Sequence, residues 1–262
     1  MTMTKFVKHS KAWHYTQCGC SANLPNQERE EKHMTNNIDK RRTYYIVLDT
    51  EGQGNVLENH TAIIYDIGFA VVDKTGKVYE TRSFVLYDTY VLERELMQTA
   101  YYANKFPKYE EDLKAGTRKM VTIFTARKEL ADLCDKYNVK AIMAHNARYD
   151  YNGLNDTLRY ITKSTMRYFF PYGVEIWDTQ KMAHDTICKQ KLYIKWCQEN
   201  GYMTKHSIPR PQEKAEVLYR YISGNNEFVE EHTGLADVMI EKEIFSKCVR
   251  QHKKMRKSLF NE

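Results

Sequence analysis

The sequence has 262 residues, of which 42% are hydrophobic, and this is enough for one α/β domain with terminal extensions. No stretch approaches the run of about 18 apolar residues that a membrane span needs, and the N-terminal residues lack an apolar signal core. These features exclude an integral membrane protein, and we expect a cytoplasmic one, in a bacterial cell or in the host cytoplasm of a phage. The net charge of +6 favours a polyanionic partner.

The chain divides by composition into a polar leader and a folded domain. Residues 1–40 show little hydrophobic periodicity, so we expect them to be flexible, followed by a domain over residues 41–262. Basic residues crowd the segment 247–257, which we interpret as part of a solvated basic C-terminal helix. The six cysteines are scattered along the chain, which predicts reduced thiols without disulfides.

Three β-rich runs open the domain and predict an antiparallel meander. The first covers residues 44–48, and the next two, 61–73 and 77–87, flank a hairpin signal at Lys74-Thr75-Gly76. The later elements that we expect are, in order, helices over 92–103 and 122–137, a strand over 140–144, a helix over 147–161, a strand over 174–177 leading to Asp178 as a helix N-cap, helices within 180–198 and 212–222, and a last helix over 235–254. This order predicts an α/β fold in which a mixed sheet, the meander plus parallel strands, is flanked by helices.

Two carboxylates follow the first predicted strand. Asp49 and Glu51 are two positions apart, so in an extended chain their side chains point to the same side. Like charges at this spacing repel each other and raise a pKa unless a cation lies between them. Taken alone, the pair is equally well interpreted as an acidic turn after a strand.

A third carboxylate, Asp150, lies on an apolar helical face. It shares this face with Leu154, Leu158 and Ile161 in the helix predicted after the strand over residues 140–144. A carboxylate on the buried side of a helix must be paired, hydrogen-bonded or bound to a metal. Hydrogen bonds from the first-turn amides of its own helix are the alternative explanation.

The last predicted helix supplies a fourth carboxylate. Asp237 shares one face of that helix with Ile240, Ile244 and Cys248, so its side chain should point inward. His232 lies five residues earlier, which places it on the loop before the helix, free to reach over a cleft. A histidine at such a position, taken alone, is more often structural.

Taken together, these motifs resemble those of the DEDDh family of 3′-to-5′ exonucleases. The matches are Asp49-Thr50-Glu51 for Asp-x-Glu after the first strand, Asn146 and Asp150 for Asn-x-x-x-Asp, and His232 and Asp237 for His-x-x-x-x-Asp. Residues 66–73 and 176–179 are also similar to the second strand and to a strand-to-helix element of that family. The resemblance covers about residues 44–250 and implies a ribonuclease H-like fold.

The resemblance implies a mechanism and a set of roles. Asp49, Glu51, Asp150 and Asp237 would hold two Mg²⁺ or Mn²⁺ ions, which hard oxygen ligands favour. Neutral His232 would take the proton from the attacking water. We expect hydrolysis at the 3′ end of a nucleic acid with release of 5′-monophosphates.

Substrate contacts are expected from residues within or beside these motifs. The resemblance implies Thr50, Gly52 and Asn146 as substrate-binding residues, although the sequence has Gly52-Gln53-Gly54-Asn55 where the family often has a threonine-rich stretch. Several tyrosines near the motifs, Tyr101 and Tyr102 among them, are candidates for base stacking.

The motifs leave the substrate and the setting open. We favour single-stranded DNA, in replication or repair, and an exoribonuclease that trims RNA 3′ ends is the alternative. A catalytically weak nucleic-acid-binding accessory of a replication complex, with replication proteins as partners, is a second alternative. The complete set of carboxylates argues against such an accessory, since unused carboxylates in one cleft would only repel each other.

Overall fold

The computed structural model describes residues 38–54, 62–165 and 167–260. Most of the expected leader over residues 1–40, with Cys18 and Cys20, lies outside the described residues. The cysteines that the structure does describe, Cys134, Cys188, Cys197 and Cys248, are buried free thiols. Among the described residues, no helix combines the length and the apolar character that crossing a membrane requires.

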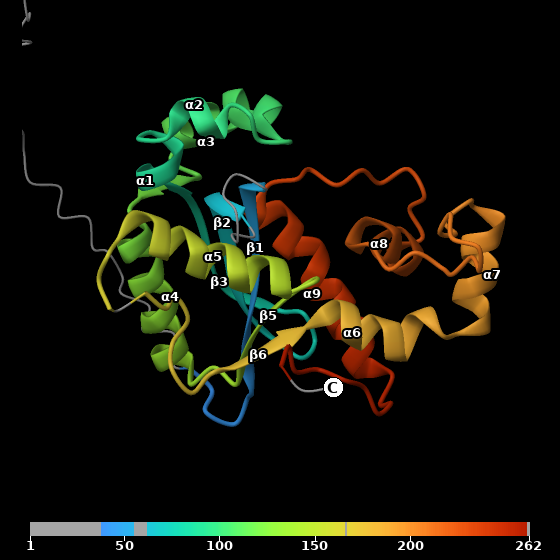
Figure 1. Cartoon of the computed structure of the whole chain (residues 1–262). Helices are drawn as coiled ribbons and strands as arrows, with labels where there is room; N and C mark the ends of the chain where they lie inside the picture. Colours follow the sequence, from blue (N-terminus) through green and yellow to red (C-terminus); the bar gives the residue numbers. More distant parts are fainter. Residues whose placement is uncertain (1–37, 55–61, 166, 261–262) are drawn as a thin grey trace, which may run out of the picture. The chain divides into compact units, whose positions relative to one another are not determined.

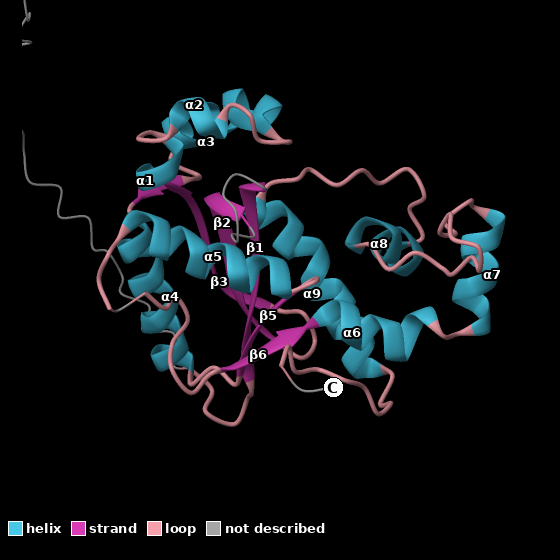
Figure 2. Ribbon diagram, viewed as in Figure 1, coloured by secondary structure: helices cyan, strands magenta, loops and turns pink. Residues whose placement is uncertain are grey.

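The centre of the fold is a six-stranded mixed sheet with the order β4-β3-β2-β1-β5-β6 (Figures 1 and 2). The antiparallel strands β1 (Tyr44–Gly54), β2 (Ala62–Asp73) and β3 (Val78–Leu86) form the predicted meander. Three short strands extend it in parallel: β4 (Lys119–Val121) beside β3, β5 (Ala141–Ala144) beside β1, and β6 (Glu175–Asp178) beside β5. This confirms the fold class expected from the sequence.

Helices cover both faces of the sheet (Figure 1). The helices and turns are α1 (Tyr87–Tyr90), α2 (Arg94–Met97), the 3₁₀ turn Ala103–Lys105, α3 (Phe106–Ala115), α4 (Ile123–Tyr137), α5 (Arg148–Ile161), α6 (Thr179–Ala183), the π-turn His184–Cys188, α7 (Lys191–Glu199), α8 (Ala215–Ser223) and α9 (Gly234–Arg250). Alternation along β1 divides the core, because Ile46 and Leu48 pack with α4 and α5 whereas Val47 packs with α6, α8 and α9.

The predicted helix over residues 92–103 is wrong. That segment forms only the short turns α2 and the 3₁₀ turn, and the regular helix, α3, follows it. Pro107 lies in the first turn of α3, where its missing N–H does no harm, and Gly116 ends the helix in a left-handed conformation with φ of 74°. The edge strand β4 was not predicted, because three residues are too few to show a period.

Two other boundaries differ from the prediction. Strand β1 continues past residue 48 to Gly54, so Asp49 and Glu51 lie within the strand and not after it. Helix α9 ends at Arg250 and not at residue 254, and His252 then takes a left-handed conformation with φ of 53°. Lys247 and Arg250 are therefore the basic residues of the last helical turn, and the following basic residues belong to an irregular segment. The predicted N-cap is confirmed, since the Asp178 side chain accepts hydrogen bonds from the backbone of Gln180 and Lys181.

Candidate active site

The site begins where the start of α9 touches the central strands. Asp49 and Glu51 of β1 lie opposite Gly68 and Asp66 of β2. A Cβ atom on Gly68 would lie 2.1 Å from the backbone nitrogen of Leu235, and one on Gly234 would lie 2.5 Å from the backbone nitrogen of Gly68. Glycine at both positions therefore allows α9 to approach the strands closely enough to bring its first turn beside the carboxylates of β1.

Asp66 fixes this approach. Its side chain is fully buried, accepts a hydrogen bond of 2.9 Å from the backbone N–H of Gly234, and forms an ion pair with the buried Arg118. The Nε atom of Arg118 also lies 3.4 Å from Oδ2 of Asp112. Asp66 belongs to none of the sequence motifs, although a carboxylate inside an apolar strand is a signal that it has a buried partner. Because both of its partners are identified, we assign Asp66 the role of anchoring α9.

Asp150 is held by the strand that carries the first motif. It lies in the first turn of α5 with 3% of its surface exposed, and its Oδ1 accepts a hydrogen bond of 2.8 Å from the Thr50 hydroxyl. Thr50 itself is buried. The Thr50 hydroxyl thus orients a carboxylate within the protein, and a role of Thr50 in substrate binding stays a prediction.

His232 and Asp237 meet Glu51 at the start of α9. One oxygen each from Glu51 and Asp237 and a ring nitrogen of His232 lie within 4.8 Å of one another. His232 precedes α9, as predicted, and has a left-handed conformation with φ of 54°. Its ring stacks on Tyr102, with centroids 4.2 Å apart, and its Nδ1 lies 3.7 Å from Glu230. This conformation and the stacking turn the imidazole toward the carboxylates.

Burial and mutual repulsion shift the protonation of these groups. Burial, reinforced by neighbouring carboxylates, raises the pKa of Glu51 to about 9 and that of Asp237 to about 8. Burial also raises the pKa of Asp150 to about 7, against the hydrogen bond from Thr50. The pKa of Asp49 is raised well above its usual range by burial, Glu241 and Asp150. A bound cation would favour the charged form of these carboxyl groups and so oppose the shifts, which are typical of functional sites.

Glu241 is a further carboxylate of the site that the sequence analysis missed. It lies one helical turn after Asp237 on α9, is 2% exposed, and accepts a hydrogen bond of 3.3 Å from the backbone N–H of His145 through Oε1. Burial, followed by the charges of Asp150 and Asp237, raises its pKa well above the usual range. The signal was present, since Glu241 shares the inward face of α9 with Asp237 and Ile244.

The site's composition fits divalent metal ions with a preference for hard ligands. Two carboxylate oxygens, Oδ2 of Asp49 and Oε2 of Glu241, are buried without a hydrogen-bond partner among the residues that the structure describes. Burying such atoms without a partner is unfavourable, and a cation would satisfy both. Apart from the His232 nitrogen, the groups gathered here are carboxylate oxygens, the ligands that suit Mg²⁺ or Mn²⁺.

The other predicted substrate-binding residues lie at the edge of this cluster. Gly52 follows an irregularity in the pairing of β1 with β2, and a Cβ atom there would lie 2.8 Å from the Ile64 side chain. Asn146 is exposed, has a left-handed conformation with φ of 64°, and donates its backbone N–H to Asp178 over 3.2 Å. Both residues are therefore at positions that backbone geometry restricts, and a role in substrate binding stays a prediction.

Neither a family model nor a curated protein matches the sequence, but solved structures do. A 3′-exonuclease studied for its 3′-end specific recognition of a histone mRNA stem-loop is 11% identical, with a TM-score of 0.50 over 82% of this chain and 85% of that one. The nuclease domain of 3′hExo, a DEDDh family member bound to rAMP, is 11% identical, with a TM-score of 0.49 over 86% of this chain and 98% of that one. E. coli exonuclease I in complex with an oligonucleotide is 14% identical, with a TM-score of 0.48 over 81% of this chain and 41% of that one. The described chain thus shares its fold with this 3′-exonuclease of the histone mRNA stem-loop.

Proposed function

We propose that the chain is a divalent-metal-dependent 3′-to-5′ exonuclease. It removes nucleotides from the 3′ end of a nucleic-acid strand, with single-stranded DNA as the favoured substrate, and releases 5′-monophosphates. The observation that supports the proposal is that the carboxylates of β1, α5 and α9 lie close enough to raise one another's pKa values, with Glu51 and Asp237 beside His232.

The carboxylates are the proposed ligands of two Mg²⁺ or Mn²⁺ ions. When bound, such ions supply an activated water and charge stabilisation for the non-bridging phosphate oxygens. Asp49 has a buried side-chain oxygen that accepts no hydrogen bond from the described part of the chain, and Asp150 is oriented by the Thr50 hydroxyl. Glu51 and Asp237 have oxygens within 4.8 Å of each other and of His232.

His232 is the proposed general base. Burial, together with the charges of Lys105 and Lys214, lowers the pKa of its imidazole below the usual value of 6.5, so the ring is neutral at pH 7 and can accept a proton. Stacking on Tyr102 restricts the ring to an orientation that faces Glu51 and Asp237. A base in a fixed orientation is effective because little reorganisation precedes the proton transfer.

The proposal is tested with end-labelled substrates incubated in parallel. Linear single-stranded DNA, closed circular single-stranded DNA, duplex DNA and RNA are each treated with Mg²⁺, with Mn²⁺ and with a chelator. We expect shortening of linear DNA only with a metal, and survival of the circles. Cleavage of circles at the rate of linear strands would contradict an exonuclease. Faster shortening of RNA than of DNA would favour the alternative, an exoribonuclease, for which the RNA-recognising structural neighbour is the supporting observation.

A further inference from the structure

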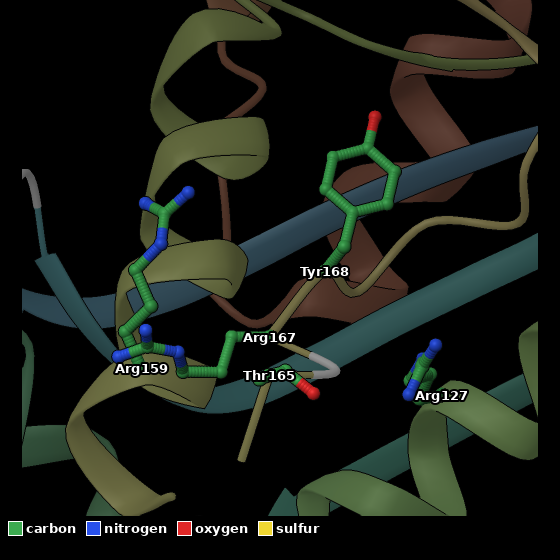
Figure 3. A pocket seen from close by; sticks show the side chains of 5 residues that line it. All are labelled: Arg127, Arg159, Thr165, Arg167 and Tyr168. Atoms are coloured by element: carbon green, nitrogen blue, oxygen red, sulfur yellow. The ribbon is translucent and has the colours of Figure 1, made fainter. Parts of the chain in front are cut away.

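A strongly basic pocket lies apart from the carboxylates. It has a volume of about 400 Å³ and is lined by Arg127 of α4, Arg159 in the last turn of α5, and Thr165, Arg167 and Tyr168 of the segment that follows α5 (Figure 3). In Figure 3, Arg159 and Arg167 lie on one side and Arg127 on the other. The pocket thus collects three guanidinium groups from three places in the sequence.

Most of this positive charge is not neutralised within the protein. Within the described part of the chain, the guanidinium groups of Arg127 and Arg167 form no ion pair and no hydrogen bond, and Arg159 pairs with Asp156 at 3.0 Å. Three cations around one hollow repel each other, so the arrangement favours an anion between them. Guanidinium groups match the paired oxygens of a phosphate, which they bind with two hydrogen bonds each.

The rim of the pocket is fixed to the helix that carries Asp150. The Tyr151 hydroxyl donates a hydrogen bond of 2.9 Å to the Tyr168 hydroxyl, and the buried Phe169 donates its backbone N–H to Asn155 over 2.9 Å. Tyr168 itself is 39% exposed, so its ring is accessible to a nucleotide base or sugar. The pocket therefore has a defined position relative to α5.

Helix geometry separates the pocket from the site of hydrolysis. Arg159 lies nine positions after Asp150, which corresponds to about 14 Å along α5 and about two and a half turns. Arg159 thus lies on the opposite side of α5 from Asp150. The path around α5, which is about 10 Å wide, adds to this axial distance, so a strand that reaches both places spans several nucleotides.

We propose that the pocket of Arg127, Arg159 and Arg167 binds a backbone phosphate of the nucleic-acid strand whose 3′ end lies at the carboxylates. This proposal rests on the proposed function. The bound phosphate lies several nucleotides from the 3′ end, because the strand has to pass over the outer surface of α5. The pocket would therefore hold long substrates and have no effect on the shortest ones.

The proposal is tested by measuring binding and not hydrolysis. A failure of the proposed phosphate pocket is therefore distinguishable from a failure of the proposed exonuclease function. The affinity of the full chain carrying Asp49→Asn is measured for fluorescent single-stranded DNA of 20 and of 3 nucleotides at several salt concentrations. The double substitution Arg127→Ala with Arg167→Ala is compared with Arg210→Ala, an exposed arginine in the segment after α7. Melting curves verify that each variant is folded.

We expect the double substitution to weaken binding of the 20-mer at least tenfold at 0.1 M salt and to leave the 3-mer unchanged. The slope of log affinity against log salt should fall by about 0.7, the value for one lost phosphate contact to a single strand. Arg210→Ala should change neither the affinity for the 20-mer nor the salt slope. The double substitution Arg127→Lys with Arg167→Lys should preserve the slope more fully than the affinity. Unchanged binding of the 20-mer, or equal weakening for both lengths, would overturn the proposal. Equally tight binding of inorganic phosphate and of the 20-mer in the parent would instead assign the pocket to free phosphate.

Discussion

Asp150→Asn should stabilise the metal-free protein at alkaline pH while it abolishes catalysis. The substitution preserves the shape of the side chain and an oxygen that can accept the hydrogen bond from Thr50. The pKa of Asp150 is raised by burial from about 3.8 to about 7 in the folded protein. A group whose pKa is raised on folding contributes stability that is fully present below its pKa in the unfolded chain. This contribution is lost as the pH rises through its pKa in the folded protein.

The magnitude follows from this shift. About three pKa units at about 1.4 kcal/mol each give a ceiling of about 4 kcal/mol, and the neighbouring carboxylates share the proton uptake, so we expect about 2 to 4 kcal/mol. For a protein of this size, this raises the melting temperature by roughly 5 to 15 °C. The gain should be near full size at pH 8 and small at pH 4.5.

Thermal unfolding in a chelator at both pH values measures the difference, with Asp132→Asn on the exposed surface of α4 as the control. Added Mn²⁺ at pH 8 should stabilise the parent more than the variant, because a cation that binds only the folded state adds free energy of unfolding. If Asp150→Asn lowered the melting temperature at pH 8 as much as at pH 4.5, burial of the charged carboxylate would not be the cause of the raised pKa of Asp150.

Three further substitutions test individual residues. His232→Ala should reduce the rate by a factor of about 10² to 10⁴ at saturating Mn²⁺. It should also remove an inflection below pH 6.5 from the parent's pH profile of the rate. Recovery of the parent rate on adding more metal would show that His232 is a metal ligand. Glu241→Gln preserves an acceptor for the His145 N–H and should raise the Mn²⁺ concentration needed for half-maximal activity. An unchanged Mn²⁺ concentration would show that the Glu241 carboxyl is structural and does not bind the metal. Gly68→Ala would place a Cβ atom against the backbone of Leu235, so both melting temperature and activity should fall, and an unaltered melting curve would contradict the close approach of α9.

The sequence predicted the parts of the fold that have a strong local signal. The meander, α4, α5 and the N-cap at Asp178 combine periodicity with clear ends, and the structure confirms them. The region between β3 and α4 was interpreted incorrectly, because short helices and a three-residue strand are determined by packing and not by periodicity.

The site was predicted less completely than its motifs suggest. The ordered motifs identified Glu51, His232 and Asp237, which the structure brings together. They did not identify the contact of Asp66 with Gly234, because a hydrogen bond across 168 positions leaves no local pattern. The hydrogen bond from Thr50 to Asp150 likewise depends on how β1 and α5 pack, which spacing alone does not determine.

The most direct test of the account is the polarity and metal dependence of digestion, measured with one oligonucleotide labelled in two ways. With Mg²⁺ or Mn²⁺, a 5′-labelled 20-mer of single-stranded DNA should give a ladder of shortened strands, and the same strand labelled at its last nucleotide should release a labelled 5′-monophosphate at the earliest times. A chelator or Asp49→Ala should stop both reactions. Release of the 5′ label first, or undiminished digestion by Asp49→Ala with its fold intact, would contradict a metal-dependent 3′-to-5′ exonuclease site at this carboxylate cluster.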